Sequence, residues 1–284
     1  MSEKNFEKLA KLAKDLPVEH RDNATALVKK MGEVIEGLGD KPLEWRPSTL
    51  KLVQATTDRS KLPKGATIGS LVLGEHVVKT PLKVIPLRFY TTRQYWNPDP
   101  LAASMVCSSP DGITGYRFGN CKACPHAKFD EVEKRSDCNK TITVISVAED
   151  FTSIFYTNFS KTNYANGVDW QGLMKKAGVS PYKRIYELNS CTSPKVKNVE
   201  ILKVEPVMVA SAPAVLDSKL LPFVEELFTL SGDDRKASLL SFYEYVDNKK
   251  ATETLLIGEQ DGSGNITLLP AAEVAAPEQG GYKL

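Results

Sequence analysis

The spacing of the cysteines is the feature of this sequence that most constrains its fold. Four of the five cysteines lie between residues 107 and 138, in the order C-x13-C-x2-C-x13-C. Zinc prefers four soft ligands at the corners of a tetrahedron, and a Cys-x-x-Cys turn supplies two of them from one tight loop. The spacing therefore predicts a structural zinc site formed by Cys107, Cys121, Cys124 and Cys138.

Three alternatives to this ligand set remain open. His126 stands two residues beyond Cys124 and is a candidate to replace one of the thiolates. A pair of disulfides requires an oxidising compartment, whereas the chain opens Met-Ser-Glu-Lys-Asn, without the charged start and apolar run of a secretory signal. A redox Cys-x-x-Cys leaves Cys107 and Cys138 unexplained. Cys191 lies outside the cluster and is expected to be a free thiol.

Composition places the chain among ordinary globular proteins. It is 42% hydrophobic and 25% charged, and it has no run of about 18 apolar residues that would predict a membrane-spanning helix. We therefore expect a cytoplasmic protein. The net charge of +2 does not by itself indicate a nucleic-acid partner. Lys and Arg gather in residues 83–96 and 171–203, and acidic residues gather in 217–259, an asymmetry compatible with a polyanion-binding face.

Hydrophobic periodicity predicts an α+β chain. Helical spacing occurs in residues 2–15, 23–38, 169–177, 217–231 and 233–248. Strand patterns occur in residues 66–73, 77–90, 141–147, 153–159, 183–190 and 199–209. This order is typical of a small barrel of the oligonucleotide-binding (OB) type. We expect an N-terminal helical arm (1–42), an OB-like barrel (43–212) with an inserted zinc-binding loop (107–138), a C-terminal helical segment (213–257) and a flexible tail (258–284).

Aromatic residues interleaved with Arg and Lys are the candidate nucleic-acid surface, because bases stack on rings while cations follow the phosphates. The alternation of residues 84–90 places Arg88 and Tyr90 on one strand face and Ile85, Leu87 and Phe89 on the other. The main candidates are Arg88, Tyr90, Arg93, Tyr95, Trp96, Tyr116, Arg117, Phe155, Lys161, Lys183 and Arg184. A wider set adds Phe118, Tyr156, Phe159, Tyr164, Trp170 and Tyr186. For each ring, packing in the core is the competing interpretation.

The motifs around the cysteines also resemble a protein family. Pro86-Leu-Arg-Phe-Tyr-Thr-Thr-Arg-Gln-Tyr-Trp96, followed by Cys-Ser-Ser-Pro-Asp-Gly and Gly-Asn-Cys-Lys-Ala-Cys-Pro-His, is similar to bacteriophage replication-region proteins regarded as zinc-containing single-stranded DNA-binding proteins. The resemblance covers residues 80–145 and extends weakly to about 205. It implies an OB-type barrel with a zinc-bearing insertion, as in the zinc-dependent single-strand binder of T-even phages, and a location in the host cytoplasm.

Three functions follow as hypotheses. The first is a largely sequence-independent single-stranded DNA-binding protein that protects DNA during phage replication or recombination. The second is a zinc-ribbon protein that modulates a polymerase in transcription or replication. The third is a DNA-processing enzyme. The sequence has only three scattered histidines and lacks a phosphate-binding loop and a His-Glu-x-x-His motif, so we expect a protein that is not an enzyme.

Overall fold

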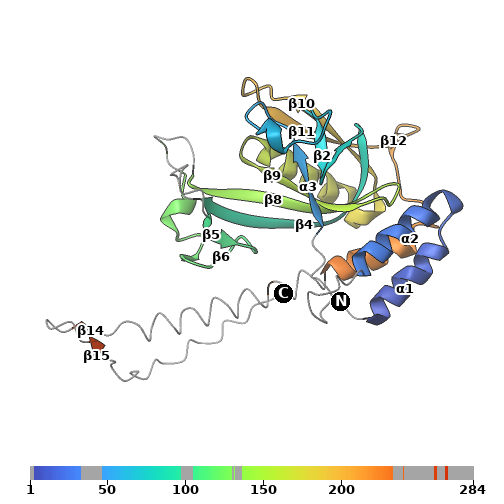
Figure 1. The fold of residues 1–284 in the computed structure, drawn as a ribbon, viewed down its shortest axis with the longest axis horizontal. Coiled ribbons are helices and arrows are strands. Elements are labelled where there is room, and N and C mark those ends of the chain that lie inside the picture. Colours follow the sequence, from blue (N-terminus) through green and yellow to red (C-terminus); the bar gives the residue numbers. More distant parts are fainter. Residues whose placement is uncertain are drawn as a thin grey trace. The chain divides into compact units, whose positions relative to one another are not determined.

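The computed structural model describes residues 3–32, 47–96, 105–129, 131, 136–232, 239, 259–260 and 266–267 (Figure 1). The chain forms two compact units, residues 1–237 and 238–284. In the second unit, β14 (Glu259–Gln260) and β15 (Ile266–Thr267) pair in antiparallel fashion. The predicted helix at 233–248 and the predicted tail fall almost entirely outside the described residues.

One nine-stranded sheet dominates the first unit, in the order β11-β10-β4-β8-β9-β1-β2-β3, with β5 also paired to β4. Its strands are β1 (Ser48–Leu52), β2 (Leu71–Leu73), β3 (His76–Val78), β4 (Leu82–Trp96), β5 (Met105–Ser109), β8 (Cys138–Ala148), β9 (Ile154–Ser160), β10 (Tyr186–Thr192) and β11 (Glu200–Pro206). Two short antiparallel pairs lie outside this sheet: β6 (Thr114–Gly115) with β7 (Gly119–Asn120), and β12 (Met208–Val209) with β13 (Ala212–Pro213). The predicted α+β class is thus confirmed.

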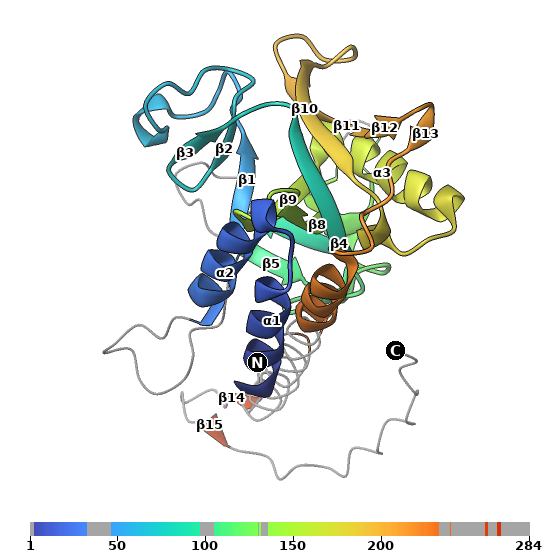
Figure 2. The ribbon, with the colours of Figure 1, turned by 90° about the vertical axis from the view of Figure 1, so that its right-hand side faces the viewer.

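The sheet curls into a half-barrel (Figure 2), so the predicted closed OB barrel is wrong for the described part of the chain. The end strands β11 and β3 do not pair with each other. Side-chain amides instead satisfy the outer edge of β11. The Gln54 amide donates to the Glu200 carbonyl at 2.8 Å and accepts from the Glu200 N–H at 2.9 Å. The Leu202 N–H donates to Asn163 Oδ1, and the Leu202 carbonyl accepts from Asn166 Nδ2.

The longest strand, β4, belongs both to the half-barrel and to the cysteine region. Its first residues, 82–84, pair with β10, and its last, 93–96, pair with β5. Its other edge pairs with β8 from Val84 to Tyr95. The β4–β8 ribbon therefore runs from the half-barrel to the region of β5 and β6 (Figure 1). We call residues 93–96, 105–129 and 136–140 the cysteine lobe.

A bulge in β4 changes which residues share a face. The pairing with β8 shifts between Pro86 and Arg88, so that Leu87 is an extra residue. After the bulge, Arg88 and Tyr90 lie on the same side as Leu87, where helices cover the sheet. Phe89 packs on the opposite side, against the second core. The predicted division of this strand, with Arg88 and Tyr90 on the face opposite Leu87, is therefore wrong.

Two hydrophobic cores lie on the two sides of the sheet. On one side, α1 (Glu3–Lys14), α2 (Val18–Gly32) and helical residues 221–232 pack on β4 and β8. An ion pair between Lys8 and the buried Glu226 joins α1 to this last helix. On the other side, α3 (Tyr164–Ala177) places Trp170 and Met174 against the inner residues of the half-barrel. The N-terminal helices thus pack on the body of the protein as a covering layer.

The ends of the helices agree only partly with the sequence prediction. Helix α1 matches the expected residues 2–15, whereas α2 begins at Val18, earlier than the expected Asn23. Helix α3 begins at Tyr164, five residues before the start that the sequence predicts at residue 169. Gly178 ends α3 in the left-handed conformation, with φ of 62°, as its sequence position predicts.

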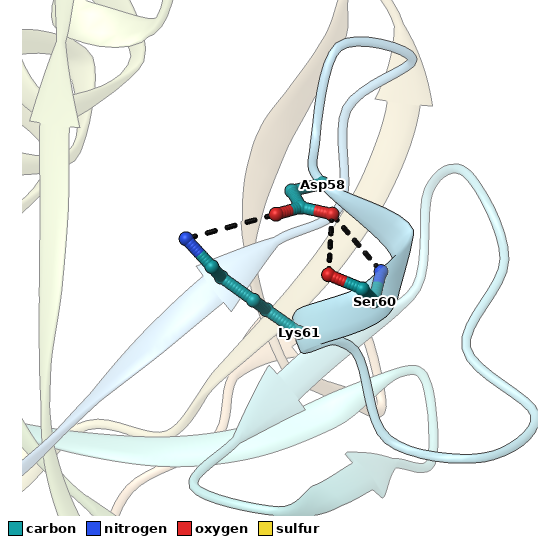
Figure 3. A network of polar contacts seen from close by, with 3 residues as sticks. All are labelled: Asp58, Ser60 and Lys61. Carbon is teal, nitrogen blue, oxygen red and sulfur yellow. Dashed lines mark hydrogen bonds and ion pairs between the residues drawn. The ribbon is translucent and has the colours of Figure 1, made fainter.

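The loop between β1 and β2 is ordered by a local network (Figure 3). The Asp58 carboxylate accepts from the Ser60 amide and hydroxyl at 3.0 and 2.7 Å, and Lys61 Nζ lies 3.6 Å from its second oxygen. The hydrogen bonds from Ser60, aided by Lys61, lower the pKa of the Asp58 carboxyl. This cap starts the short 3-10 helix Arg59–Lys61.

Candidate functional site

The four cysteines of the predicted zinc site line one small cavity in the cysteine lobe. Cys107 lies in β5 and Cys138 begins β8, and both are paired with Tyr95 of β4, one on each side. Cys121 and Cys124 come from the turn after β7. All four are buried, with 7 to 8% of their surface exposed, and none forms a disulfide. Cys191 lies in β10, outside this cavity, and is a free thiol in the structure.

Asn120 forms the Cys-x-x-Cys turn with its backbone and its side chain. Its carbonyl accepts from the amides of Ala123 and Cys124, each at 3.1 Å. Its side-chain oxygen accepts from the Lys122 amide at 2.9 Å. The preceding Gly119 has φ of 67°, a backbone region that glycine enters without steric cost. Pro125 then starts the 3-10 helix Pro125–Ala127.

A second turn, between β5 and β6, holds the opposite wall of the cavity. Asp111 Oδ1 accepts hydrogen bonds, all at 2.8 Å, from the Ser109 hydroxyl and from the amides of Ile113 and Thr114. The Cys121 amide donates to the Ile113 carbonyl at 2.8 Å, which joins the two turns. This pairing brings Cys121 toward Cys107, although they are far apart in the sequence.

Among the described residues, no group of three or more His, Cys, Asp or Glu side chains is placed so that it could hold a metal ion, so the predicted zinc-binding insertion is not present as a formed metal site in this structure. A Cβ atom on Gly115 would lie 2.9 Å from Cys107 Sγ and 3.8 Å from Cys121 Sγ, so glycine leaves the space between these sulfurs clear. Four buried thiols around one cavity, without a disulfide, are the chemistry that a tetrahedral four-cysteine zinc site requires. The four thiols that line this cavity are therefore a donor set of the kind that binds Zn²⁺.

Burial and a nearby guanidinium shift the pKa values of two of the thiols in opposite directions. Burial raises the pKa of Cys121 and of Cys138 above the usual value, while the positive charge of Arg93 partly offsets that rise. Arg93 is also within hydrogen-bonding reach of the Cys138 thiol. Without a metal the two thiols are thus held in the protonated form at neutral pH.

An aromatic stack covers the cavity. The rings of Tyr95 and His126 are stacked, with centroids 4.4 Å apart and planes inclined by 19°. The ring of Phe118 contacts both at a tilt, with its centroid 6.2 Å from that of Tyr95 and 5.0 Å from that of His126. His126 Nδ1 lies 3.2 Å from Asp137 Oδ2, which fixes the ring. His126 therefore lines the same cavity as the four cysteines.

Two of the predicted DNA contacts are engaged inside the protein. Arg88 donates to the Phe228 carbonyl through Nε at 3.1 Å and Nη2 at 2.7 Å, and its guanidinium carbon lies 3.8 Å from the centroid of the Phe228 ring. The Tyr90 hydroxyl donates to the Ser231 carbonyl at 3.4 Å. Both side chains join β4 to the helical residues 221–232, so we remove them from the candidate surface.

The remaining candidates divide between core and surface. Phe155 is fully buried in the second core, as are Phe159, Trp170 and Tyr186 of the wider set, and a stacking role is incompatible with these positions. The Tyr116 hydroxyl donates to the Val106 carbonyl at 2.5 Å, and Arg184 donates to the Pro213 carbonyl at 2.8 Å. Tyr156 and Lys183 are partly exposed. Trp96, Arg117, Phe118 and Lys161 are exposed.

The structure adds one residue that the sequence analysis missed. Lys140 of β8 is exposed, and its ammonium lies 5.5 Å from the ring centroid of the half-exposed Tyr164 at the start of α3. Alternation along β8 places Lys140 on the same face as Cys138 and Ile142. The sequence signal for this residue was that Lys140 occupies the position between Cys138 and Ile142 in the alternation of β8, where an inward-facing residue is expected.

No described helix is long and apolar enough to cross a membrane. In comparisons with protein-family models, curated proteins and solved structures, nothing matches this chain.

Proposed function

We propose that this protein binds single-stranded DNA, largely independently of sequence, along the face of β4 and β8 that leads from the cysteine lobe to α3. The proposed surface consists of Arg117, Phe118, Lys140, Lys161 and Tyr164. The observation that carries the proposal is the Lys140–Tyr164 pair, in which an exposed cation and a half-exposed ring stand together. The resemblance to phage replication-region proteins suggests replication or recombination as the setting.

The two ends of this surface offer the same chemistry. In the cysteine lobe, the exposed Phe118 lies against Tyr95 and His126, and the guanidinium carbon of Arg117 is 5.7 Å from its ring centroid. At α3, Lys140 lies over Tyr164, and Lys161 follows the end of β9. Rings stack on bases of any sequence, and cations track the backbone. This combination favours a single strand, whose bases are free to stack.

We further propose that a structural Zn²⁺, held by Cys107, Cys121, Cys124 and Cys138, stabilises the lobe. The ion would supply cross-links between the two turns and the β4–β8 ribbon. Asn120 and Asp111 shape the turns, and Gly115 keeps the space between two of the sulfurs open. An ordered lobe would present Phe118 and Arg117 with less loss of conformational entropy on binding.

The test is a titration of fluorescent oligo(dT) by anisotropy at several salt concentrations. Lys140→Ala removes one phosphate contact, so the affinity should fall and the slope of log K against log salt should become shallower by about 0.7. Tyr164→Leu removes a ring but keeps apolar bulk, so the affinity should fall by about 1 to 3 kcal/mol with little change in slope. Lys64→Ala, an exposed lysine in the β1–β2 loop, is the matched control.

Melting temperatures of the same variants separate binding from folding. If folded Lys140→Ala and Tyr164→Leu proteins bind oligo(dT) as tightly as the parent, the proposed surface is wrong. A parent protein that binds zinc but ignores the oligonucleotide would favour the second hypothesis, a zinc-ribbon protein acting on a polymerase.

A further inference from the structure

Arg93 lies in the sheet row next to two of the cysteines. It is paired with Ser109 of β5 and Lys140 of β8, and Tyr95, two residues further along β4, is paired with Cys107 and Cys138. Directly paired side chains point to one face of a sheet, and alternate residues in a strand share that face. The register therefore directs Arg93 to the cysteine side, and its side chain lines the same cavity as the four thiols.

The contacts of Arg93 leave one strong donor without an acceptor. The side chain is within hydrogen-bonding reach of the Cys138 thiol, and its charge acts on both Cys138 and Cys121. Its Nε atom is buried and has no hydrogen-bond partner. A buried charged donor without an acceptor is costly. Thiolate sulfurs in this cavity are the acceptors that would satisfy it.

We propose that Arg93 is a positioning residue of the cysteine centre, where its guanidinium donates hydrogen bonds to the sulfurs of Cys138 and Cys121 and offsets the negative charge of a four-thiolate zinc site. Four thiolates around Zn²⁺ carry a net charge of −2, which is unfavourable among buried groups unless a cation compensates it. Donors that hold the ligands from outside the coordination sphere are an established means of tuning metal affinity.

This role replaces the phosphate contact that the sequence predicted for Arg93. A phosphate ligand must present its guanidinium to solvent, whereas Arg93 directs its guanidinium toward buried sulfurs. The inference rests on the proposed zinc site and not on the proposed DNA surface. A role in positioning the cysteines and a role in binding phosphate therefore predict different results for the same Arg93 variant.

The test uses the purified full-length protein and measures zinc affinity by competition with a chromogenic chelator. Arg93→Met should weaken zinc binding by about 10- to 100-fold. Arg93→Lys keeps the charge but loses the fork of donors, so its loss should be smaller. Lys128→Met removes an exposed charge from the same lobe and should leave zinc affinity within about two-fold of the parent, the scatter expected when a surface charge away from specific contacts is removed.

Two further readouts distinguish positioning from DNA contact. With Co²⁺ in place of zinc, the thiolate-to-metal absorption band should shift in Arg93→Met and stay unchanged in Lys128→Met. Zinc-saturated Arg93→Met should bind oligo(dT) like the parent, with the same salt slope.

Three results would overturn the inference. The first is unchanged zinc affinity in Arg93→Met, whatever happens to oligonucleotide binding. The second is zinc-saturated Arg93→Met that binds oligo(dT) more weakly with a shallower salt slope, which would make Arg93 a phosphate ligand. The third is a parent protein that binds neither Zn²⁺ nor Co²⁺, in which case the proposed DNA surface is still judged by its own titration. If Arg93→Met does not fold, Arg93→Lys carries the same comparison.

Discussion

Two glycines in α3 should respond in opposite directions to the same substitution. At Gly167, an added Cβ would lie 2.7 Å from Phe159 Cβ and 3.2 Å from Ile142 Cβ. At Gly172, in the same helix, no atom lies within 4 Å of the added carbon. Gly167 thus lies where α3 approaches β8 and β9 closely, and Gly172 faces open space.

The expected magnitudes follow from two opposing terms. Alanine is favoured over glycine in a helix interior by about 1 kcal/mol, so Gly172→Ala should raise the free energy of unfolding by up to that amount. Its melting temperature should rise by about 2 to 4 °C. Gly167→Ala has the same helical gain, but overpacking costs about 1 to 3 kcal/mol. The crowding atoms include two Cβ carbons, which no rotamer change can move, so we expect a cost in the upper part of that range, about 2 to 3 kcal/mol, and a net loss of about 1 to 2 kcal/mol.

Urea unfolding followed by circular dichroism measures both variants on the same scale. The denaturant slopes should match that of the parent, since neither change alters the surface exposed on unfolding by much. The reasoning is refuted if Gly167→Ala is as stable as Gly172→Ala, because that result would mean that α3 does not pack against Phe159 and Ile142 as the structure shows.

Two further predictions test roles that the sequence suggested for Arg88 and for the cysteines. Arg88→Met should lower the free energy of unfolding by about 2 to 4 kcal/mol, since it removes the hydrogen bonds to the Phe228 carbonyl and the contact with its ring. The affinity of this variant for oligo(dT) should be unchanged. A variant with the stability of the parent and weaker binding would return Arg88 to the DNA surface. Cys138→Ser should lower zinc content and melting temperature together, because metal binding is coupled to folding, whereas Cys191→Ser should change neither. The reverse pattern, measured by elemental analysis and thermal melting, would contradict the ligand set.

The strands rich in β-branched and aromatic residues were predictable from the sequence. Residues 141–147 and 153–159 have this composition, and they form most of the β8–β9 hairpin. The predicted strands at 183–190 and 199–209 include most of the paired strands β10 and β11. In each of these two pairs the partner strand is the next one along the chain, so local sequence is sufficient to identify both strands.

Features that depend on distant partners were not predictable. Strand β1 has only five residues in a segment rich in proline, and it is stabilised by a parallel pairing with β9, about a hundred residues away. The bulge at Leu87 shows only in the register with β8, yet it decides which face Arg88 occupies. An OB-type order of elements likewise does not say whether the end strands will pair.

The grouping of the four cysteines was predictable from their spacing, whereas their surroundings were not. The four thiols line one cavity, because Cys107 and Cys138 pair with Tyr95 of β4 from its two sides and the Cys-x-x-Cys turn lies between them in the chain. The spacing could not show that Arg93 faces those thiols, since that depends on the register of β4 with β5. Lys140 and Tyr164 come together only because α3 folds back on β8.

The side-chain amides that bind β11 bear on whether the open half-barrel can aggregate through its edge. An open sheet ends in a row of backbone donors and acceptors, which is a template for another strand and a common route to aggregation. Here Gln54, Asn163 and Asn166 already occupy that row at Glu200 and Leu202. Three side chains thus act as a substitute for the missing neighbouring strand at Glu200 and Leu202, and the backbone groups of these two residues are not available to pair with a second molecule.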